Sequence, residues 1–269
     1  MTRSRPICIL HAAFCIAWVA FSAACGARRV PFPSDPGSPL PNYADLHAEV
    51  TAACRGARTL TAELGLRGRV GSRRISGRLV SGFETPAKMR LEAVAPFGPP
   101  GFILAARGDQ AVLLLPRDER VVKGQSAEAI LGALTGVALA PADLQAILTG
   151  CVLPASTATG GRLHSNGWAS IDLDGGATMY LQRMGTWRVR AARRDGWEVD
   201  YPQWQGQFPQ ALRLRSASEP ANVDLTATLA QIEVNRDLDP TAFTVDVPAS
   251  ASPLSIEELR DAGPLGERP

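Results

Sequence analysis

The amino-acid sequence predicts an α+β fold: a curled antiparallel sheet of about eleven strands forming a half-barrel, with an N-terminal helix and a helical lid over an apolar cavity. Three observations carry this prediction. Apolar and polar residues alternate with a period of two through most of residues 64–234, as in strands with one buried face. Tight turns join nearly all of these segments, which favours antiparallel pairing. Residues 126–150 interrupt the alternation with an apolar helical pair.

The first 24 residues have the features of an export signal: a basic start, an apolar run from Ile7 to Phe21, and small residues before Cys25. Two processing routes are open, acylation of Cys25 as in lipoproteins or ordinary cleavage after Ala24. Ser22 departs from the Leu usual in lipoproteins and favours ordinary cleavage. Residues 25–42 favour acylation, because this Pro- and Gly-rich stretch has the composition of a tether that would reach roughly 20 Å.

Composition limits the classes of function. The chain has 269 residues, 45% hydrophobic and 20% charged, which is enough for one large core or two small ones. Removal of residues 1–24 takes away Arg3 and Arg5 and no acid, and leaves 26 basic and 26 acidic side chains. A net charge near zero argues against a nucleic-acid partner.

Two cysteines remain once the signal is removed and Cys25 is acylated. In an oxidising compartment Cys54 and Cys151 could form a disulfide that pins the end of the lid to the scaffold. Two buried free thiols are an almost equally favoured alternative, because spacing alone cannot give geometry. The sequence shows no spacing typical of metal ligands, and we expect no cofactor.

An amphipathic helix is predicted over residues 43–62, with His47 at the edge of its apolar stripe. Twelve segments then have strand character. They are 64–70, 74–83, 89–93, 102–107, 110–116, 120–123, 162–172, 177–183, 187–193, 197–201, 211–215 and 223–234.

The loop at residues 95–102 contains Phe97 among Pro and Gly residues that cannot form a strand interior. An aromatic side chain on a stiff turn is either buried by a neighbouring element or enters something apolar. The sequence gives these two interpretations nearly equal weight. Phe102, at the end of the loop, is grouped with Phe97.

Residues 126–150 predict a lid of two short helices. Pro141 begins the second helix and Gly150 ends it. The lid carries two acids and no His, Cys or Lys, so we expect it to cover something apolar. Two helices cannot cover the whole concave face, and we therefore expect a cavity. Its predicted lining residues are Ile130, Leu131, Leu134, Val137, Leu144, Ile147 and Leu148 of the lid and Leu79, Leu91 and Leu104 of the sheet.

Motifs for catalysis are weak. Asp172-Leu173-Asp174-Gly175-Gly176 lacks the further acids of a calcium loop and fits a hairpin turn. His164 has no nucleophile motif near it. We therefore expect no enzymatic activity. The last segment, 249–269, predicts a short helix opened by Ser255 that packs on the open edge of the sheet.

Several of these features together resemble the LolA/LolB family of outer-membrane lipoprotein-localisation proteins. The resemblance rests on the signal ending at Cys25, the N-terminal helix, the Ala95-Pro96-Phe97-Gly98 turn and, most specifically, the lid sequence from Leu134 to Gly150. It places one domain at residues 43–248. Membership would imply an eleven-stranded half-barrel that holds acyl chains, and a protruding loop with Phe97 where Leu is usual.

The resemblance implies a non-enzymatic lipoprotein that shelters acyl chains and helps to insert lipoproteins into the outer membrane. Its expected partners are acyl chains of lipids or lipoproteins, a periplasmic carrier protein, and the membrane through a palmitate-type anchor. We expect the periplasmic face of the outer membrane as its location, with a soluble periplasmic or secreted chain as the alternative. A rival hypothesis is an assembly lipoprotein whose half-barrel docks a protein partner within an envelope complex.

Overall fold

The computed structural model describes residues 31–194, 196–216 and 222–262. Contacts divide the chain into Met1–Phe32 and Pro33–Pro269, and the fold below is that of the second unit. The predicted signal and Cys25 lie outside the described residues. Within the described ranges, no helix combines the length and the apolar character needed to cross a bilayer.

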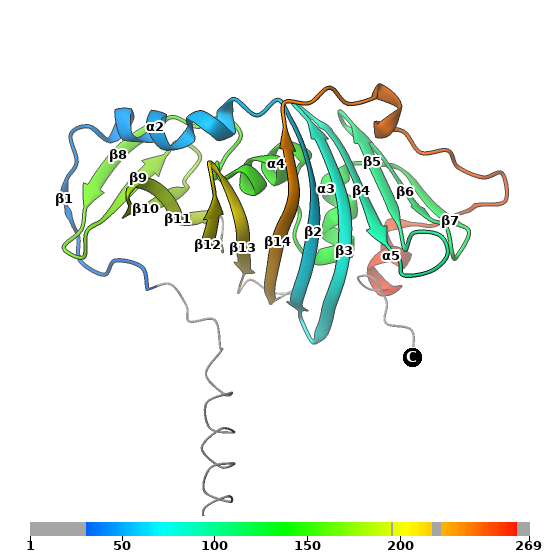
Figure 1. The fold of residues 1–269 in the computed structure, drawn as a ribbon. Helices are drawn as coiled ribbons and strands as arrows, with labels where there is room; N and C mark the ends of the chain where they lie inside the picture. The colour runs from blue at the N-terminus through cyan, green and yellow to red at the C-terminus, as the bar shows by residue number, and fades with distance from the viewer. Residues whose placement is uncertain (1–30, 195, 217–221, 263–269) are drawn as a thin grey trace, which may run out of the picture. The chain divides into compact units, whose positions relative to one another are not determined.

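The described residues form a large, mostly antiparallel sheet of fifteen strands (Figure 1). The strands are β1 (Ser38–Pro39), β2 (Thr59–Val70), β3 (Arg73–Glu84), β4 (Lys88–Val94), β5 (Ile103–Arg107), β6 (Gln110–Leu115), β7 (Arg120–Gln125), β8 (Ala158–Leu163), β9 (Trp168–Leu173), β10 (Thr178–Met184), β11 (Thr186–Arg194), β12 (Trp197–Gln205), β13 (Phe208–Ser216), β14 (Val223–Val234) and β15 (Ser252–Pro253). Their order is β1-β8-β9-β10-β11-β12-β13-β14-β2-β3-β4-β5-β6-β7-β15, and only β15 runs parallel to its neighbour in the described sheet.

The fifteen strands exceed the predicted total of about eleven and the twelve segments with strand character for identifiable reasons. The single strand predicted over 162–172 is wrong, because Asn166 and Gly167 form a turn between β8 and β9. Gly167 has φ of 78°, and the Asn166 side chain accepts a hydrogen bond from the Trp168 amide. The two-residue strands β1 and β15 were not predicted either. Because β1 pairs with β8, the end of the predicted 25–42 tether belongs to the sheet.

The sheet is open, with β1 and β15 at its two edges. The α+β class and the antiparallel pairing are thus confirmed. The predicted strong curl is not found: the sheet is open and its two edge strands do not meet, so a half-barrel is not the arrangement that this structure shows.

Four α-helices and one 3-10 helix accompany the sheet in the described residues. They are α2 (Tyr43–Arg55), α3 (Ala127–Thr135), α4 (Pro141–Thr149), η2 (Pro240–Phe243) and α5 (Ile256–Ala262). Figure 1 shows α3 and α4 against one face of the sheet. Helix α2 contacts β8, β11 and α4.

Helix α2 ends seven residues earlier than predicted. Gly56 follows its last residue, and β2 already begins at Thr59. Leu60, Ala62 and Leu64 are buried in alternation on β2. The apolar residues of the helix are followed almost directly by the buried residues of β2. The helical period of 3.6 therefore appeared to continue into residues that form a strand.

The lid helices are confirmed. The Ser126 side chain accepts a hydrogen bond from the Ala129 amide and caps α3. Pro141 occupies the first turn of α4, where its missing amide hydrogen costs nothing. Gly136 and Gly150 end the two helices in the left-handed conformation, with φ of 70° and 90°.

The core lies between the lid and the inner face of the sheet. Strand register sets its rows: Leu91 on β4 faces Leu104 on β5, and Leu104 faces Leu113 on β6. All three side chains are at most 3% exposed. Period-two alternation therefore places one apolar row beneath the lid helices.

The C-terminal segment packs on the sheet and then on the lid. Arg90 donates hydrogen bonds to the carbonyls of Ala242 and Thr244, which holds the η2 segment near β4 and β5. β15 then pairs with β7 and becomes the edge strand of the sheet, and α5 packs against α3. The predicted edge packing and the Ser255 cap, which accepts from the Glu258 amide at 3.1 Å, are both confirmed.

Candidate functional site

The apolar face of the lid packs against the inner face of the sheet. Every predicted lining residue belongs to one apolar cluster, in which Val137 and Leu144 are partly buried and the others are buried. The buried members are Ile130, Leu131, Leu134, Ile147, Leu148, Leu79, Leu91 and Leu104. The structure thus shows the lid closed on the sheet, and the cavity stays a prediction that requires the lid to move.

A cleft of about 340 Å³ lies elsewhere, at the ends of β2, β3 and β14. Charged and polar residues such as Arg58, Glu84, Lys88 and Asp237 contribute to its lining. An acyl chain would gain less there than in an apolar cavity, because charged and polar groups interrupt the lining.

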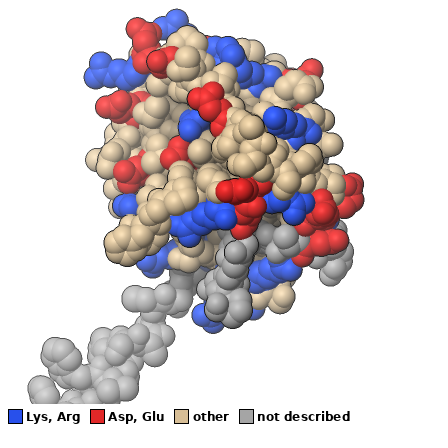
Figure 2. All heavy atoms as spheres, turned by 90° about the vertical axis from the view of Figure 1, so that its right-hand side faces the viewer, with Lys and Arg blue, Asp and Glu red and all other residues tan. Residues whose placement is uncertain are grey.

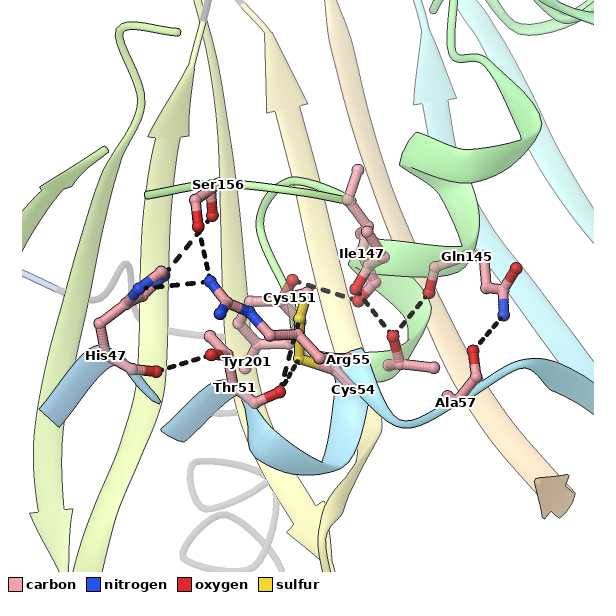
Figure 3. The surroundings of a disulfide bond; sticks show 12 residues. His47, Thr51, Cys54, Arg55, Ala57, Gln145, Ile147, Cys151, Ser156 and Tyr201 are labelled. Carbon is pink, nitrogen blue, oxygen red and sulfur yellow. Dashed lines mark hydrogen bonds between the residues drawn. A yellow bond between two sulfur atoms is a disulfide. The ribbon is translucent and has the colours of Figure 1, made fainter. Parts of the chain in front are cut away.

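A disulfide ties the end of the lid to α2 (Figure 3). Cys54 lies in the last turn of α2 and Cys151 follows α4, and their Cα atoms are 5.7 Å apart. The bond joins residues 97 positions apart in the chain. In this structure the disulfide, and not a pair of free thiols, fixes the C-terminal end of α4.

Two buried hydrogen bonds hold α4 further. The Gln145 side chain donates to the Ala57 carbonyl at 3.0 Å, and the Tyr201 hydroxyl donates to the Ile147 carbonyl at 3.1 Å. Complete burial raises the pKa of the Tyr201 hydroxyl, which keeps it a neutral donor. Neither contact was predicted, because each joins residues that lie far apart in the sequence.

His47 lies beside the disulfide and is 3% exposed. Its ring nitrogens are 3.4 Å from Arg55 Nη2 and 3.5 Å from Ser156 Oγ. Burial and then the charge of Arg55 lower the pKa of His47, which favours the neutral ring. The interpretation of His47 as a structural histidine at the core edge fits this setting.

Helix α3 is attached differently from α4. The first turn of α4 carries Asp143, which pairs with Arg194 at 2.7 Å. In α3 and its cap, the side-chain hydrogen bonds found among the described residues are local, from Ser126 and Thr135. α3 is therefore held to the sheet by apolar contacts, and the Gly136 linker separates it from the anchored α4.

This asymmetry predicts unequal hydrogen exchange in the lid. Amides of α3 should exchange at least about tenfold faster than those of α4, because within the described part of the chain no disulfide or long-range side-chain hydrogen bond restrains α3 from opening. Hydrogen–deuterium exchange with peptide-level mass spectrometry measures both helices in one sample. Equal protection of 127–135 and 141–149 would contradict a lid that opens at α3.

Phe97 is exposed on the loop between β4 and β5. Its side chain is 89% accessible, so of the two interpretations the structure shows the displayed one. Gly98 beside it adopts φ of 75°. At the base of the loop, Gly101 and Ala93 form a backbone hydrogen bond of 3.0 Å.

Arg117, in the turn between β6 and β7, holds this loop in place. Its Nη2 donates to the Phe97 carbonyl at 2.9 Å and its Nε to the Pro99 carbonyl at 3.2 Å. No sequence pattern pointed to Arg117, because Arg117 and the Phe97 loop belong to different hairpins. The clamp fixes the backbone that displays the aromatic ring.

Phe102 does not share the position of Phe97. It is 3% exposed and lies in the apolar core just before β5. Its assignment to the insertion loop is wrong. The residue falls in phase with the buried Leu104, so strand alternation turns it inward.

Comparison with known structures identifies the architecture. A DUF1329 family protein from Desulfovibrio piger aligns with a TM-score of 0.50 at 11% identity, over 77% of this chain and 98% of that chain. A LolA superfamily protein from Nitrosomonas europaea aligns with a TM-score of 0.50 at 10% identity, over 75% of this chain and 97% of that chain. The chain has a LolA-like fold. At these identities the likeness concerns the LolA-like fold alone, and no protein-family description and no curated protein matches the sequence.

Proposed function

We propose that this chain is a non-enzymatic lipoprotein that shelters acyl chains between lid and sheet and helps to insert lipoproteins into the outer membrane. The LolA-like fold supports a role in lipid or lipoprotein binding. The observation that carries the proposal is the lid: two short helices cover the apolar inner face, and α3 has no polar bond to the sheet among the described residues. Because α3 is held to the sheet by apolar contacts, an acyl chain can take its place on the apolar inner face.

The energetics allow such an exchange. Each methylene removed from water contributes about 0.8 kcal/mol, so a chain of about fourteen methylenes gives roughly 11 kcal/mol. This exceeds the cost of lifting a helix that buries a few aliphatic side chains. We propose that α3 swings away and that α4 stays attached through Cys151.

Localisation at the periplasmic face of the outer membrane is part of the same proposal. The disulfide fits an oxidising compartment outside the cytoplasm. Acylation of Cys25 would anchor the chain, and the tether would run from Cys25 to β1 at Ser38. A periplasmic carrier protein would supply the cargo.

Native mass spectrometry of the purified protein tests the proposal. We expect a co-purified acyl ligand, and binding of a fluorescent fatty acid after delipidation that unlabelled palmitate reverses. A ligand-free protein that binds no fatty acid would overturn acyl binding. That outcome would favour the second candidate, an assembly lipoprotein that docks a protein partner, for which the tightly closed lid is the supporting observation.

A further inference from the structure

The hairpin of β2 and β3 carries an unusual concentration of one charge. Between Glu63 and Glu84 the sequence contains five arginines and no acid. All five are exposed; they are Arg67, Arg69, Arg73, Arg74 and Arg78. By contrast, Figure 2, which looks onto the right-hand side of Figure 1, shows basic and acidic side chains intermingled.

Strand register gathers four of these arginines on one face. Arg69 lies directly opposite Arg74, and Arg67 and Arg78 follow on the same side of the ribbon at intervals of two and four. Buried residues Val70, Ile75 and Leu79 occupy the other side. Like charges in directly opposed positions disfavour pairing of the strands. An anion bound to this face would remove the repulsion between these arginines.

Two acids border these four arginines, Glu63 on the same face of β2 and Asp224 on β14, and neither forms an ion pair with them among the described residues. Asp224 on β14 faces Arg69 in the register, but its carboxylate is engaged by Nε and Nη2 of Arg213. Within the described ranges, none of the four forms an ion pair; they are Arg67, Arg69, Arg74 and Arg78.

The arginine face lies next to the Phe97 loop. Arg78 pairs with Val94, the last residue of β4, and the loop follows directly. Figure 1 shows the β2–β3 turn projecting beyond the ends of the neighbouring strands. Val80, next along the same face, is 48% exposed. This end of the domain, which we call the rim, therefore combines the guanidinium groups of the arginine face with the exposed apolar side chains of Phe97 and Val80.

We propose that Arg67, Arg69, Arg74 and Arg78 bind the phosphates of anionic lipid head groups and orient the domain on a bilayer. Guanidinium groups match phosphate in charge and can donate two parallel hydrogen bonds. An apolar and cationic rim suits the boundary between head groups and acyl chains, whereas an acidic protein would not require Phe97 beside it. The proposal deepens the proposed function, because it gives the membrane-facing end of the domain.

The test uses the full mature chain with Cys25→Ala, so that no lipid anchor contributes. Co-sedimentation is measured with vesicles of phosphatidylcholine alone and with vesicles containing phosphatidylglycerol. The test variant changes Arg67, Arg69, Arg74 and Arg78 to Gln. A control variant removes the same charge from exposed positions elsewhere, by Arg107→Gln, Lys123→Gln, Arg183→Gln and Arg260→Gln.

We expect salt-sensitive binding to anionic vesicles by the parent chain. Each basic group at such a surface contributes about fivefold in affinity, so the test variant should lose at least about a hundredfold, and the control variant much less. Equal losses of vesicle affinity in the two variants would overturn the proposal. So would binding by the parent chain that does not depend on phosphatidylglycerol. Unchanged melting temperature and fatty-acid binding in the test variant separate this result from misfolding and from failure of the proposed acyl site.

Discussion

Replacing Phe97 with Glu is expected to abolish transfer of acylated cargo to vesicles while leaving acyl-chain binding unchanged. The side chain is 89% exposed, so the substitution removes almost no packing from the fold. Exchanging an apolar ring for a carboxylate in an apolar membrane layer costs about 3 kcal/mol, or roughly a hundredfold in insertion of the loop. Transfer of a fluorescent acylated peptide from protein to vesicles measures the effect.

Phe97→Leu is the matched control, because it keeps an apolar side chain on the same backbone. It should transfer at close to the parent rate. Arg117→Ala should fall between the two variants, since it releases the carbonyls of Phe97 and Pro99 but leaves the ring. Normal transfer by Phe97→Glu would remove this loop from the mechanism.

Removal of the disulfide is expected to lower the free energy of unfolding by about 4 kcal/mol. The bond closes a loop of 97 residues, and long loops give large entropic effects on the unfolded chain. The double variant Cys54→Ala and Cys151→Ala also frees the end of α4 from α2. Urea unfolding should show a lower midpoint with a modest change in slope.

The parent chain under reducing conditions should unfold like the double variant. Agreement between the two samples assigns the loss to the covalent bond and not to the alanines. A double variant within about 1 kcal/mol of the oxidised parent would mean that hydrogen bonds such as that of Gln145 anchor α4 unaided.

Much of the fold could be predicted because its signals are local. Pro141, Gly150 and the apolar spacing between them define α4, and period-two alternation locates most strands. Errors arose where two periods meet, as at Leu60, and where a turn was overlooked, as at Asn166-Gly167. Both lie in short stretches in which the apolar pattern continues across a boundary.

The site was less predictable because it depends on distances between layers. Alternation says that Leu91 and Leu104 face inward, but it does not say whether the lid touches them. The sequence singled out Phe97 through its Pro and Gly neighbours, whereas the exposure of Phe97 and the burial of Phe102 required the structure. The Arg117 clamp and the Tyr201 bond join residues remote in sequence, and no local pattern marks them.

The central claim is that an acyl chain enters between the lid and the inner face of the sheet. Photo-crosslinking with a palmitate that carries a diazirine near its methyl end tests this claim most directly, with labelled peptides mapped by mass spectrometry. The account predicts labels on α3, α4 and the inner residues of β3 to β5, suppressed by excess unlabelled palmitate. Labels confined to the outer face of the sheet or to the polar cleft near Arg58, or no competable label, would contradict it.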